Sequence, residues 1–158
     1  MKTLIIYYSY GGNTRRVAEL IREETGGVLL EIETMRPYEG SYREVLEQGR
    51  REVETRSWPE LKPMEVDLNQ YDSIFLGTPT WWYTCASAVT AFLLSYDLSG
   101  KRIHPFITCG DSKGTSLKGL KKACPGMELA TELEVKFQKH EMRTPEEDIR
   151  RWSKDALK

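Results

Sequence analysis

The chain has 158 residues, of which 39% are apolar and 30% charged, proportions that suit one globular domain spanning residues 1–158 with its own hydrophobic core. Its 23 Lys and Arg residues nearly balance 24 Asp and Glu residues, so the net charge of -1 gives no electrostatic case for binding nucleic acid or an anionic membrane. The apolar run after Lys2 is too short for a signal-peptide core or a membrane span. These features predict a cytoplasmic protein without a nucleic-acid or membrane partner.

The cysteines and histidines indicate neither metal binding nor thiol chemistry. Cys85, Cys109 and Cys124 cannot all pair within one chain and show no CxxC or CxxH spacing, so reduced thiols are expected. His104 falls within a predicted strand and His140 in the segment before the last helix. We therefore assign no metal ligand and no catalytic side chain.

Apolar runs alternate with amphipathic segments along the whole chain. Strands are predicted near residues 2–9, 28–34, 73–78, 102–109 and 129–135, with helices between them and one after the last. The second helix, at about residues 42–55, is mostly charged and is expected to be exposed. This alternation is typical of an α/β fold, here a three-layer αβα sandwich around a five-stranded parallel sheet.

The charge on each strand predicts its place in the sheet. The first and third strands are nearly continuous hydrophobic runs, as strands covered on both faces are, whereas the second carries Glu31 and Glu33 and the fifth carries Glu132 and Glu134. Placing the charged strands at the edges gives the order 2-1-3-4-5, with a topological switch point between the first and third strands. Pro105 removes a ladder donor from the internal fourth strand and is expected to precede its paired part.

The first strand runs directly into a polar, glycine-containing turn, Ser9-Tyr10-Gly11-Gly12-Asn13-Thr14, and then into a helix. Such a turn directs backbone N–H groups and the positive end of the helix dipole at one point, where a phosphate can bind. Arg15 and Arg16 strengthen this prediction, because cations at that end of a helix are unfavourable unless an anion lies nearby. The alternative is an ordinary capped turn with solvated arginines.

Three adjacent aromatic residues, Trp81, Trp82 and Tyr83, follow the third strand. Aromatic planes suit a flat ligand, and the hydroxyls of Thr78 and Thr80 lie beside them in the sequence. The alternative is that one Trp belongs to the core and another lies on the surface.

The loop after the fourth strand, residues 108–116, is rich in backbone donors and carries one carboxylate, Asp111. By itself it is most simply a solvated turn whose Asp and Ser residues cap the next helix. In the predicted topology, however, the loops after strands one, three and four open onto the same crevice. Together they require a ligand with a phosphate at one end and a planar polar ring at the other, which favours a mononucleotide.

These three loops, in this order, resemble those of the flavodoxins, which bind FMN, and the absence of a long insertion in the fifth strand is similar to the short-chain form. The resemblance implies that the first loop holds the phosphate, that Pro79, Thr80 and Trp81 face the inner side of the flavin ring, and that Cys109, Gly110 and Asp111 hold its pyrimidine edge. Asp111 would then lower the second reduction potential, because a carboxylate disfavours extra negative charge. The full predicted cofactor site is Ser9, Tyr10, Gly11, Gly12, Asn13, Thr14, Thr78, Pro79, Thr80, Trp81, Trp82, Thr108, Cys109, Gly110, Asp111 and Gly114.

The chain departs from the usual flavodoxin pattern at three points. Trp82 stands where a small residue, often Gly, permits a peptide flip on reduction, and a bulky side chain penalises the positive φ involved. The Lys113-Gly114 stretch replaces the Tyr that stacks on the outer face of the ring, so the ring is open unless Trp82 or Tyr83 covers it. The nearly neutral charge also steers basic partners only weakly.

The resemblance therefore favours an electron-transfer carrier of the flavodoxin type, with FMN as cofactor and either a redox protein or a small acceptor such as a quinone as partner. The alternative is an NAD(P)H-dependent FMN reductase acting on a quinone or a flavin. A non-enzymatic regulatory module such as a phospho-acceptor domain is disfavoured, because the first and third strands end without the acidic residues that it requires. Either a monomer or a homodimer is compatible with the sequence.

Overall fold

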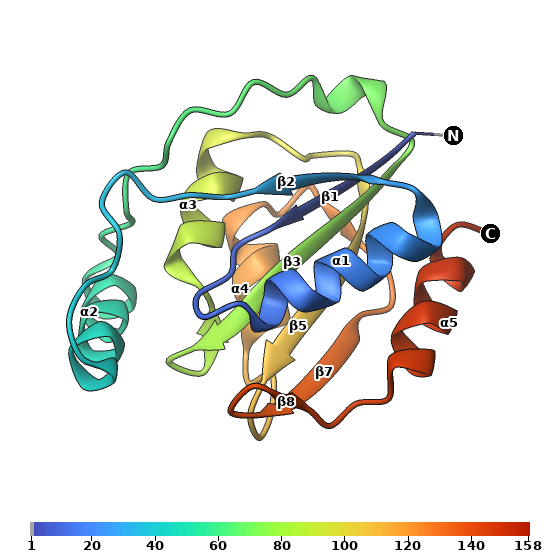
Figure 1. Cartoon of the computed structure of the whole chain (residues 1–158). Coiled ribbons are helices and arrows are strands. Elements are labelled where there is room, and N and C mark those ends of the chain that lie inside the picture. The colour runs from blue at the N-terminus through green and yellow to red at the C-terminus, as the bar shows by residue number, and fades with distance from the viewer. Residues whose placement is uncertain (1) are drawn as a thin grey trace.

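The computed structural model describes residues 2–158, along which strands and helices alternate as predicted (Figure 1). The strands are β1 (Thr3–Tyr7), β2 (Val28–Glu31), β3 (Ser73–Trp81), β4 (Thr84–Cys85), β5 (Arg102–Cys109), β6 (Glu128–Leu129), β7 (Leu133–Gln138) and β8 (Glu141–Met142). The helices are α1 (Asn13–Thr25), α2 (Tyr42–Thr55), α3 (Ser87–Ser95), α4 (Ser116–Ala123) and α5 (Glu146–Ala156), with a short 3₁₀ helix, η1 (Leu68–Gln70).

The five longer strands form a parallel sheet in the order β2-β1-β3-β5-β7. Counted along the chain, this is the predicted order 2-1-3-4-5, with the charged strand β2 at one edge. The strand count differs from the prediction, because β4, β6 and β8, of two residues each, extend the sheet. β4 and β8 run antiparallel to β3 and β7, and β6 runs parallel to β5.

The expectations for Pro105 and for the fifth strand are wrong. Pro105 lies within β5, paired with Leu76 of β3, and the predicted fifth strand is divided into β6 and β7. The pairing of β5 with β6 ends at Ile103 and its pairing with β7 begins at Phe106. The Ile103 carbonyl accepts a hydrogen bond from Ala130 N–H (2.8 Å), so Ile103, and Pro105 two residues later, face this side of β5. The missing N–H is therefore tolerated because it falls at the gap between β6 and β7.

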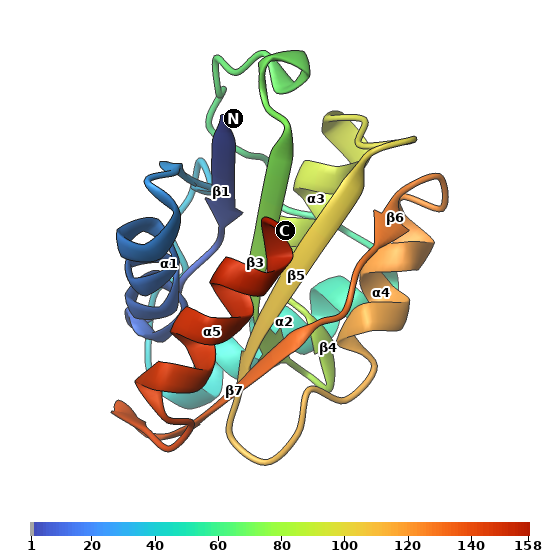
Figure 2. The ribbon, with the colours of Figure 1, turned by 90° about the vertical axis from the view of Figure 1, so that its right-hand side faces the viewer.

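Helices cover both faces of the sheet, α1 and α5 on one face and α3 and α4 on the other (Figure 2). Successive side chains of β1 alternate between these layers, since Ile5 and Tyr7 belong to the cluster under α1 and α5, whereas Leu4 and Ile6 belong to the cluster under α3 and α4. All four side chains are buried. The three-layer αβα arrangement therefore follows from a strand that is apolar on both faces.

Helix α2 lies at the side of the molecule, where it contacts the end of β3 and helix α3 (Figure 1). It begins at a capping box, in which Ser41 Oγ accepts the N–H of Glu44 (3.2 Å) and the Glu44 carboxylate accepts the N–H of Ser41 (3.3 Å). Its bounds match the predicted helix at residues 42–55, and only Val45 and Gly49 are buried. The expectation of a mostly exposed helix is confirmed.

Within residues 2–158, no helix is long and apolar enough to cross a membrane. The same residues contain no group of three or more His, Cys, Asp or Glu side chains placed to hold a metal ion. Cys85, Cys109 and Cys124 are all buried as free thiols.

Candidate functional site

A cavity of about 680 Å³ opens at the carboxyl ends of β1, β3 and β5. This is the predicted switch point of the sheet, where ligands of open α/β folds bind, and the volume lies in the range of roughly 300–1,000 Å³ that is typical of small-molecule sites. The cavity brings together residues of all three predicted loops. Those that line it are Tyr10, Gly11, Asn13, Thr14, Pro79, Thr80, Trp81, Trp82, Thr108, Cys109 and Gly110.

The loop between β1 and α1 presents free backbone donors to this cavity. Gly11 (φ 85°) and Gly12 (φ 100°) have positive φ, a conformation that glycine adopts without strain. Gly12 occupies the N-cap position of α1 without a side-chain cap. In the described part of the chain, the N–H groups of Asn13 and Thr14 donate to no protein acceptor. These amides and the helix dipole form a site for an anion.

The two arginines that follow do not contribute to this anion site. Arg15 forms an ion pair with Glu31 of β2, and Arg16 Nη2 lies 3.7 Å from Glu146 Oε1 of α5. Each cation already has a carboxylate nearby, so neither supports the prediction of a bound phosphate, and this part of the sequence argument is wrong. Ser9 does not line the cavity either, and its Oγ accepts the N–H of Arg15 (3.1 Å).

Hydroxyl groups connect the three loops beneath the cavity. Thr14 Oγ1 and Thr108 Oγ1 lie 2.8 Å apart, and Thr80 Oγ1 donates to the carbonyl of Thr108 (3.1 Å). Thr78 is fully buried below this layer, where its Oγ1 accepts the N–H of Ala86 (2.9 Å) just before α3. The structure therefore places Thr78 in the support of the site and outside the cavity lining.

Trp81 forms one wall of the cavity and is held by other aromatic rings. Its ring contacts those of Tyr8, Tyr10 and Tyr38 edge to face, with centroid distances of 5.7, 5.6 and 4.9 Å. A Cβ atom at Gly49 of α2 would lie 3.2 Å from Trp81 Cε3, so the glycine lets the helix approach the indole closely. Such edge-to-face contacts contribute about 0.5–1.5 kcal/mol each and fix the orientation of the ring.

The tip of the hairpin that joins β3 to β4 contains two bulky residues with positive φ, Trp82 (48°) and Tyr83 (64°). Trp82 therefore adopts the positive φ that its bulky side chain is expected to penalise. Both central residues of a type I′ hairpin turn require positive φ, and Asn-Gly is the favoured pair there. Trp82 lines the cavity, and the Cζ atom of Arg50 lies 5.5 Å from the centroid of a Trp82 ring. Tyr83 is 73% exposed and does not line the cavity.

The loop after β5 contributes only its first part to the cavity. Cys109 and Gly110 line it, whereas Asp111 is exposed and outside the lining. Burial raises the pKa of the Cys109 thiol to about 11, with the Glu134 carboxylate adding to the effect, so the thiol stays protonated at neutral pH. A bound ring would therefore meet a neutral thiol at this edge of the cavity, and the Asp111 carboxylate is not brought to it.

The second half of the same loop, from Lys113 onward, contacts β7 and the β3–β4 hairpin instead of the cavity. Lys113 N–H donates to Glu134 Oε2 (2.9 Å), and Lys113 Nζ lies 3.4 Å from Glu132 Oε1. A Cβ atom on Gly114 would lie 2.3 Å from the carbonyl oxygen of Tyr83. Gly114 therefore supports the hairpin by its lack of a side chain and does not reach the cavity.

Two segments that complete the cavity are not predicted from the sequence, the turn between β7 and β8 and the first half of helix α2. The turn closes against the first loop, since Asn13 Nδ2 donates to the carbonyl of Lys139 (2.8 Å) and Asn13 Oδ1 lies 3.2 Å from His140 Nδ1. The positive φ of Lys139 (56°) shapes this turn. No local signal predicts a contact between segments so far apart in the chain. The other missed lining residues are Phe137, Tyr42, Val45, Leu46 and Gly49.

The comparison with known families agrees with this geometry. The sequence model of the family described as flavodoxin matches residues 2–155. The chain belongs to the flavodoxin family. The search of curated proteins found no match to this flavodoxin-family chain.

Solved structures similar to this flavodoxin-family protein include a proposed flavoprotein from Bacteroides eggerthii DSM 20697, which is 28% identical with a TM-score of 0.82 over 99% of this chain and 98% of that one. A flavoprotein from Lactobacillus acidophilus NCFM, solved in complex with FMN, is 22% identical with a TM-score of 0.74 over 84% and 92%. Oxidised Flavodoxin 2 from Bacillus cereus is 24% identical with a TM-score of 0.59 over 99% and 96%. At 22% and 24% identity, the last two comparisons show a shared fold and no more.

Proposed function

We propose that this protein binds FMN in the cavity at the carboxyl ends of β1, β3 and β5 and carries electrons between redox partners. The proposal rests on the pair of free amides at Asn13 and Thr14. They line a cavity that also presents the aromatic side chains of Trp81 and Trp82. This donor set fits a phosphate, and Trp81 and Trp82 offer ring surface to a flat heterocycle. The FMN-bound flavoprotein from Lactobacillus acidophilus, which shares the fold, supports the choice of nucleotide.

FMN supplies the redox chemistry when bound, and this chain supplies binding and orientation. The amides of Asn13 and Thr14 would hold the phosphate. Trp81, kept in place by its tyrosine neighbours, would orient the ring. The partner is a redox protein or a small acceptor such as a quinone, and the place of action is the cytoplasm.

A specific observation also favours a second function, NAD(P)H-dependent reduction of a quinone or a flavin. Lys113 is fastened to Glu132 and Glu134, and Gly114 lies under Tyr83, so the loop after β5 places no aromatic ring over the cavity. A ring bound there is open to a second planar molecule on that side. Direct hydride transfer needs a nicotinamide stacked on the ring in close, aligned contact, and such room permits this.

Titration with FMN and with riboflavin tests the binding site itself. Riboflavin lacks the phosphate, so we expect it to bind about 100-fold more weakly than FMN, as the loss of charge-assisted hydrogen bonds implies. Quenching of flavin fluorescence measures both affinities. Arg15→Gln is the matched control and should leave the FMN affinity unchanged, because Arg15 pairs with Glu31. Equal affinity for the two flavins, or no binding at micromolar FMN, would contradict the proposal.

Anaerobic reduction separates the two functions. A carrier shows a stable half-reduced spectrum during reductive titration and reacts slowly with NADPH. A reductase is bleached directly by NADPH or NADH and turns over with a quinone.

A further inference from the structure

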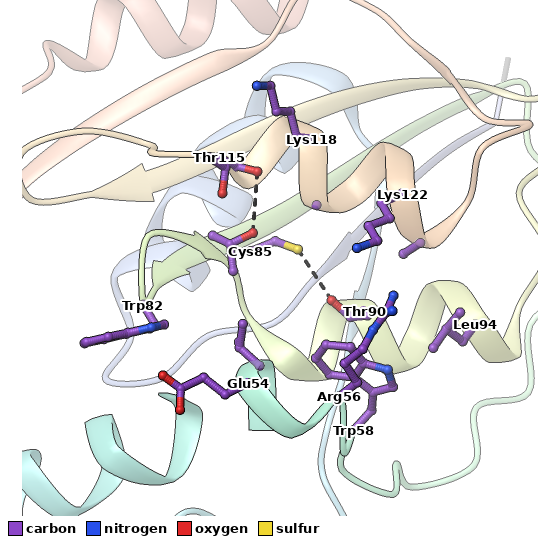
Figure 3. A pocket seen from close by; sticks show the side chains of 14 residues that line it. Glu54, Arg56, Trp58, Trp82, Cys85, Thr90, Leu94, Thr115, Lys118 and Lys122 are labelled. Carbon is purple, nitrogen blue, oxygen red and sulfur yellow. Dashed lines mark hydrogen bonds between the residues drawn. The ribbon is translucent and has the colours of Figure 1, made fainter. Parts of the chain in front are cut away.

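A second cavity, of about 480 Å³, lies beside the first, between the C-terminal end of α2, helices α3 and α4, and the hairpin of β3 and β4 (Figure 3). Trp82 lines both cavities, from the tip of the hairpin. The site described above uses none of the other residues that line this second cavity. Its chemistry therefore needs a separate explanation.

Positive charge predominates around the second cavity. Three cations line it, Arg56 at the end of α2 and Lys118 and Lys122 on α4, against one carboxylate, Glu54. Among residues 2–158, Glu54 Oε1 accepts a hydrogen bond from Arg50 Nε (3.0 Å), whereas none of the three cations has an ion-pair partner. Lys122 and Arg56 approach the cavity from opposite sides (Figure 3). The uncompensated charge favours an anionic ligand.

The walls and floor of the second cavity are apolar or neutral. Leu94 is 58% exposed and Trp82 43%, and Trp58 also lines the cavity, so aromatic and aliphatic surface is open to a ligand. The buried Cys85 Sγ lies 3.5 Å from Thr90 Oγ1 at the floor, and burial raises the pKa of this thiol, so it adds no negative charge. A ligand that fits must therefore combine a flat apolar body with a negative group.

We propose that the second cavity binds small aromatic anions, that is, planar molecules carrying a carboxylate or a sulfonate. The negative group is held between Arg56 and Lys122, and the rings lie against Trp58, at the end of the cavity away from Trp82 (Figure 3). The cavity reaches the border of the first one at Trp82. Use of the bound anion as the small electron donor or acceptor rests on the proposed function, whereas its binding does not.

Two probes of nearly equal shape test the proposal, naphthalene-2-sulfonate and the uncharged naphthalene-2-sulfonamide. Calorimetric titration of the full chain, without FMN and again with saturating FMN, measures their affinities. We expect the sulfonate to bind about tenfold more tightly than the sulfonamide, and amide NMR shifts to map it to residues 84–90 and 115–123.

Variants on one helix localise the charge requirement. Lys122→Gln should weaken sulfonate binding about tenfold, since it removes a cation from the cavity. Lys121→Gln is the matched control, because it removes the same charge from the neighbouring position, which does not line the cavity, and it should bind as the original protein does.

Equal binding of the two probes, wild-type affinity in Lys122→Gln, or amide shifts confined to residues 9–14 with competition by FMN would overturn the proposal. If the sulfonate binds as expected while FMN does not bind, the proposed function alone fails. If FMN binds and the sulfonate does not, only the second site fails.

Discussion

Each of the two loops that meet at the first cavity contains two consecutive residues with positive φ, but these are glycines in one loop and aromatic residues in the other. In the loop between β1 and α1, positive φ falls on Gly11 and Gly12. In the hairpin between β3 and β4 it falls on Trp82 and Tyr83. The first loop adopts its conformation without steric cost, whereas each aromatic residue of the second costs about 1–2 kcal/mol.

The difference shows where the rest of the fold must stabilise a loop. The hairpin is held from outside, because the Tyr83 carbonyl accepts both the N–H (2.7 Å) and the Oγ1 hydroxyl (3.0 Å) of Thr115. Gly114 permits this approach by having no side chain. The first loop leaves the amides of Asn13 and Thr14 free for a ligand.

The largest effect is expected when the support of the hairpin is removed. Gly114→Ala places a Cβ atom 2.3 Å from the Tyr83 carbonyl at a residue with φ of 53°, so the free energy of unfolding should fall by about 3 kcal/mol. Urea denaturation measures it. Gly110→Ala, where a Cβ atom would meet nothing within 4 Å, is the control and should change stability little. Similar losses in both variants would refute the supporting role of Gly114.

A smaller loss is expected when the glycine loop is given a side chain. Gly12→Ala meets no atom within 4 Å, but the φ of 100° disfavours a Cβ atom, so stability should fall by about 1–2 kcal/mol. The same denaturation experiment, with FMN affinity measured in parallel, checks both consequences. Unchanged stability would mean that the loop relaxes freely and that glycine is not required there.

Tyr83 offers the converse test, because a glycine should relieve strain at this position. Both Tyr83→Ala and Tyr83→Gly lose the same exposed ring, yet only the alanine keeps a Cβ atom at φ of 64°. We expect the glycine variant to be more stable than the alanine variant by about 1 kcal/mol, the reverse of the usual order. Thermal unfolding of the two variants, measured side by side, shows which of them is the more stable.

The smallest effect concerns the contact between the first loop and the β7–β8 turn. Asn13→Ala removes the hydrogen bond to the Lys139 carbonyl (2.8 Å) and the contact with His140 (3.2 Å), which should lower the free energy of unfolding by about 0.5–1 kcal/mol. His140→Ala removes the contact with Asn13 Oδ1 and keeps the hydrogen bond to the Lys139 carbonyl. Wild-type stability in the His140 variant would show that this contact contributes nothing.

Local patterns were sufficient for most of the fold. Helix α2 has the bounds predicted for the second helix, residues 42–55, and the structure adds the Ser41 and Glu44 capping box at its start. The order of the main strands followed from which strands carry glutamates. The break between β6 and β7 was not predicted, since it depends on which edge of β5 Pro105 faces, and this is a property of the assembled sheet.

The candidate site was predicted in its loops but not in its surroundings. The cavity gathers residues from all three predicted loops, yet Asp111 and Gly114 lie outside its lining. Sequence spacing does not tell which residues of a loop point inward. The sequence also does not reveal the positive φ of Trp82, because intrinsic preference opposes it, whereas tertiary contacts such as those of the neighbouring Tyr83 carbonyl stabilise the turn.

The contact of Asn13 with Lys139 and His140 joins residues 126 and 127 positions apart. During synthesis the amide-rich turn leaves the ribosome well before the residues that close it laterally. The cavity therefore cannot be complete until Lys139 and His140 have been translated. A nascent or truncated chain that ends before Lys139 has the turn without this wall.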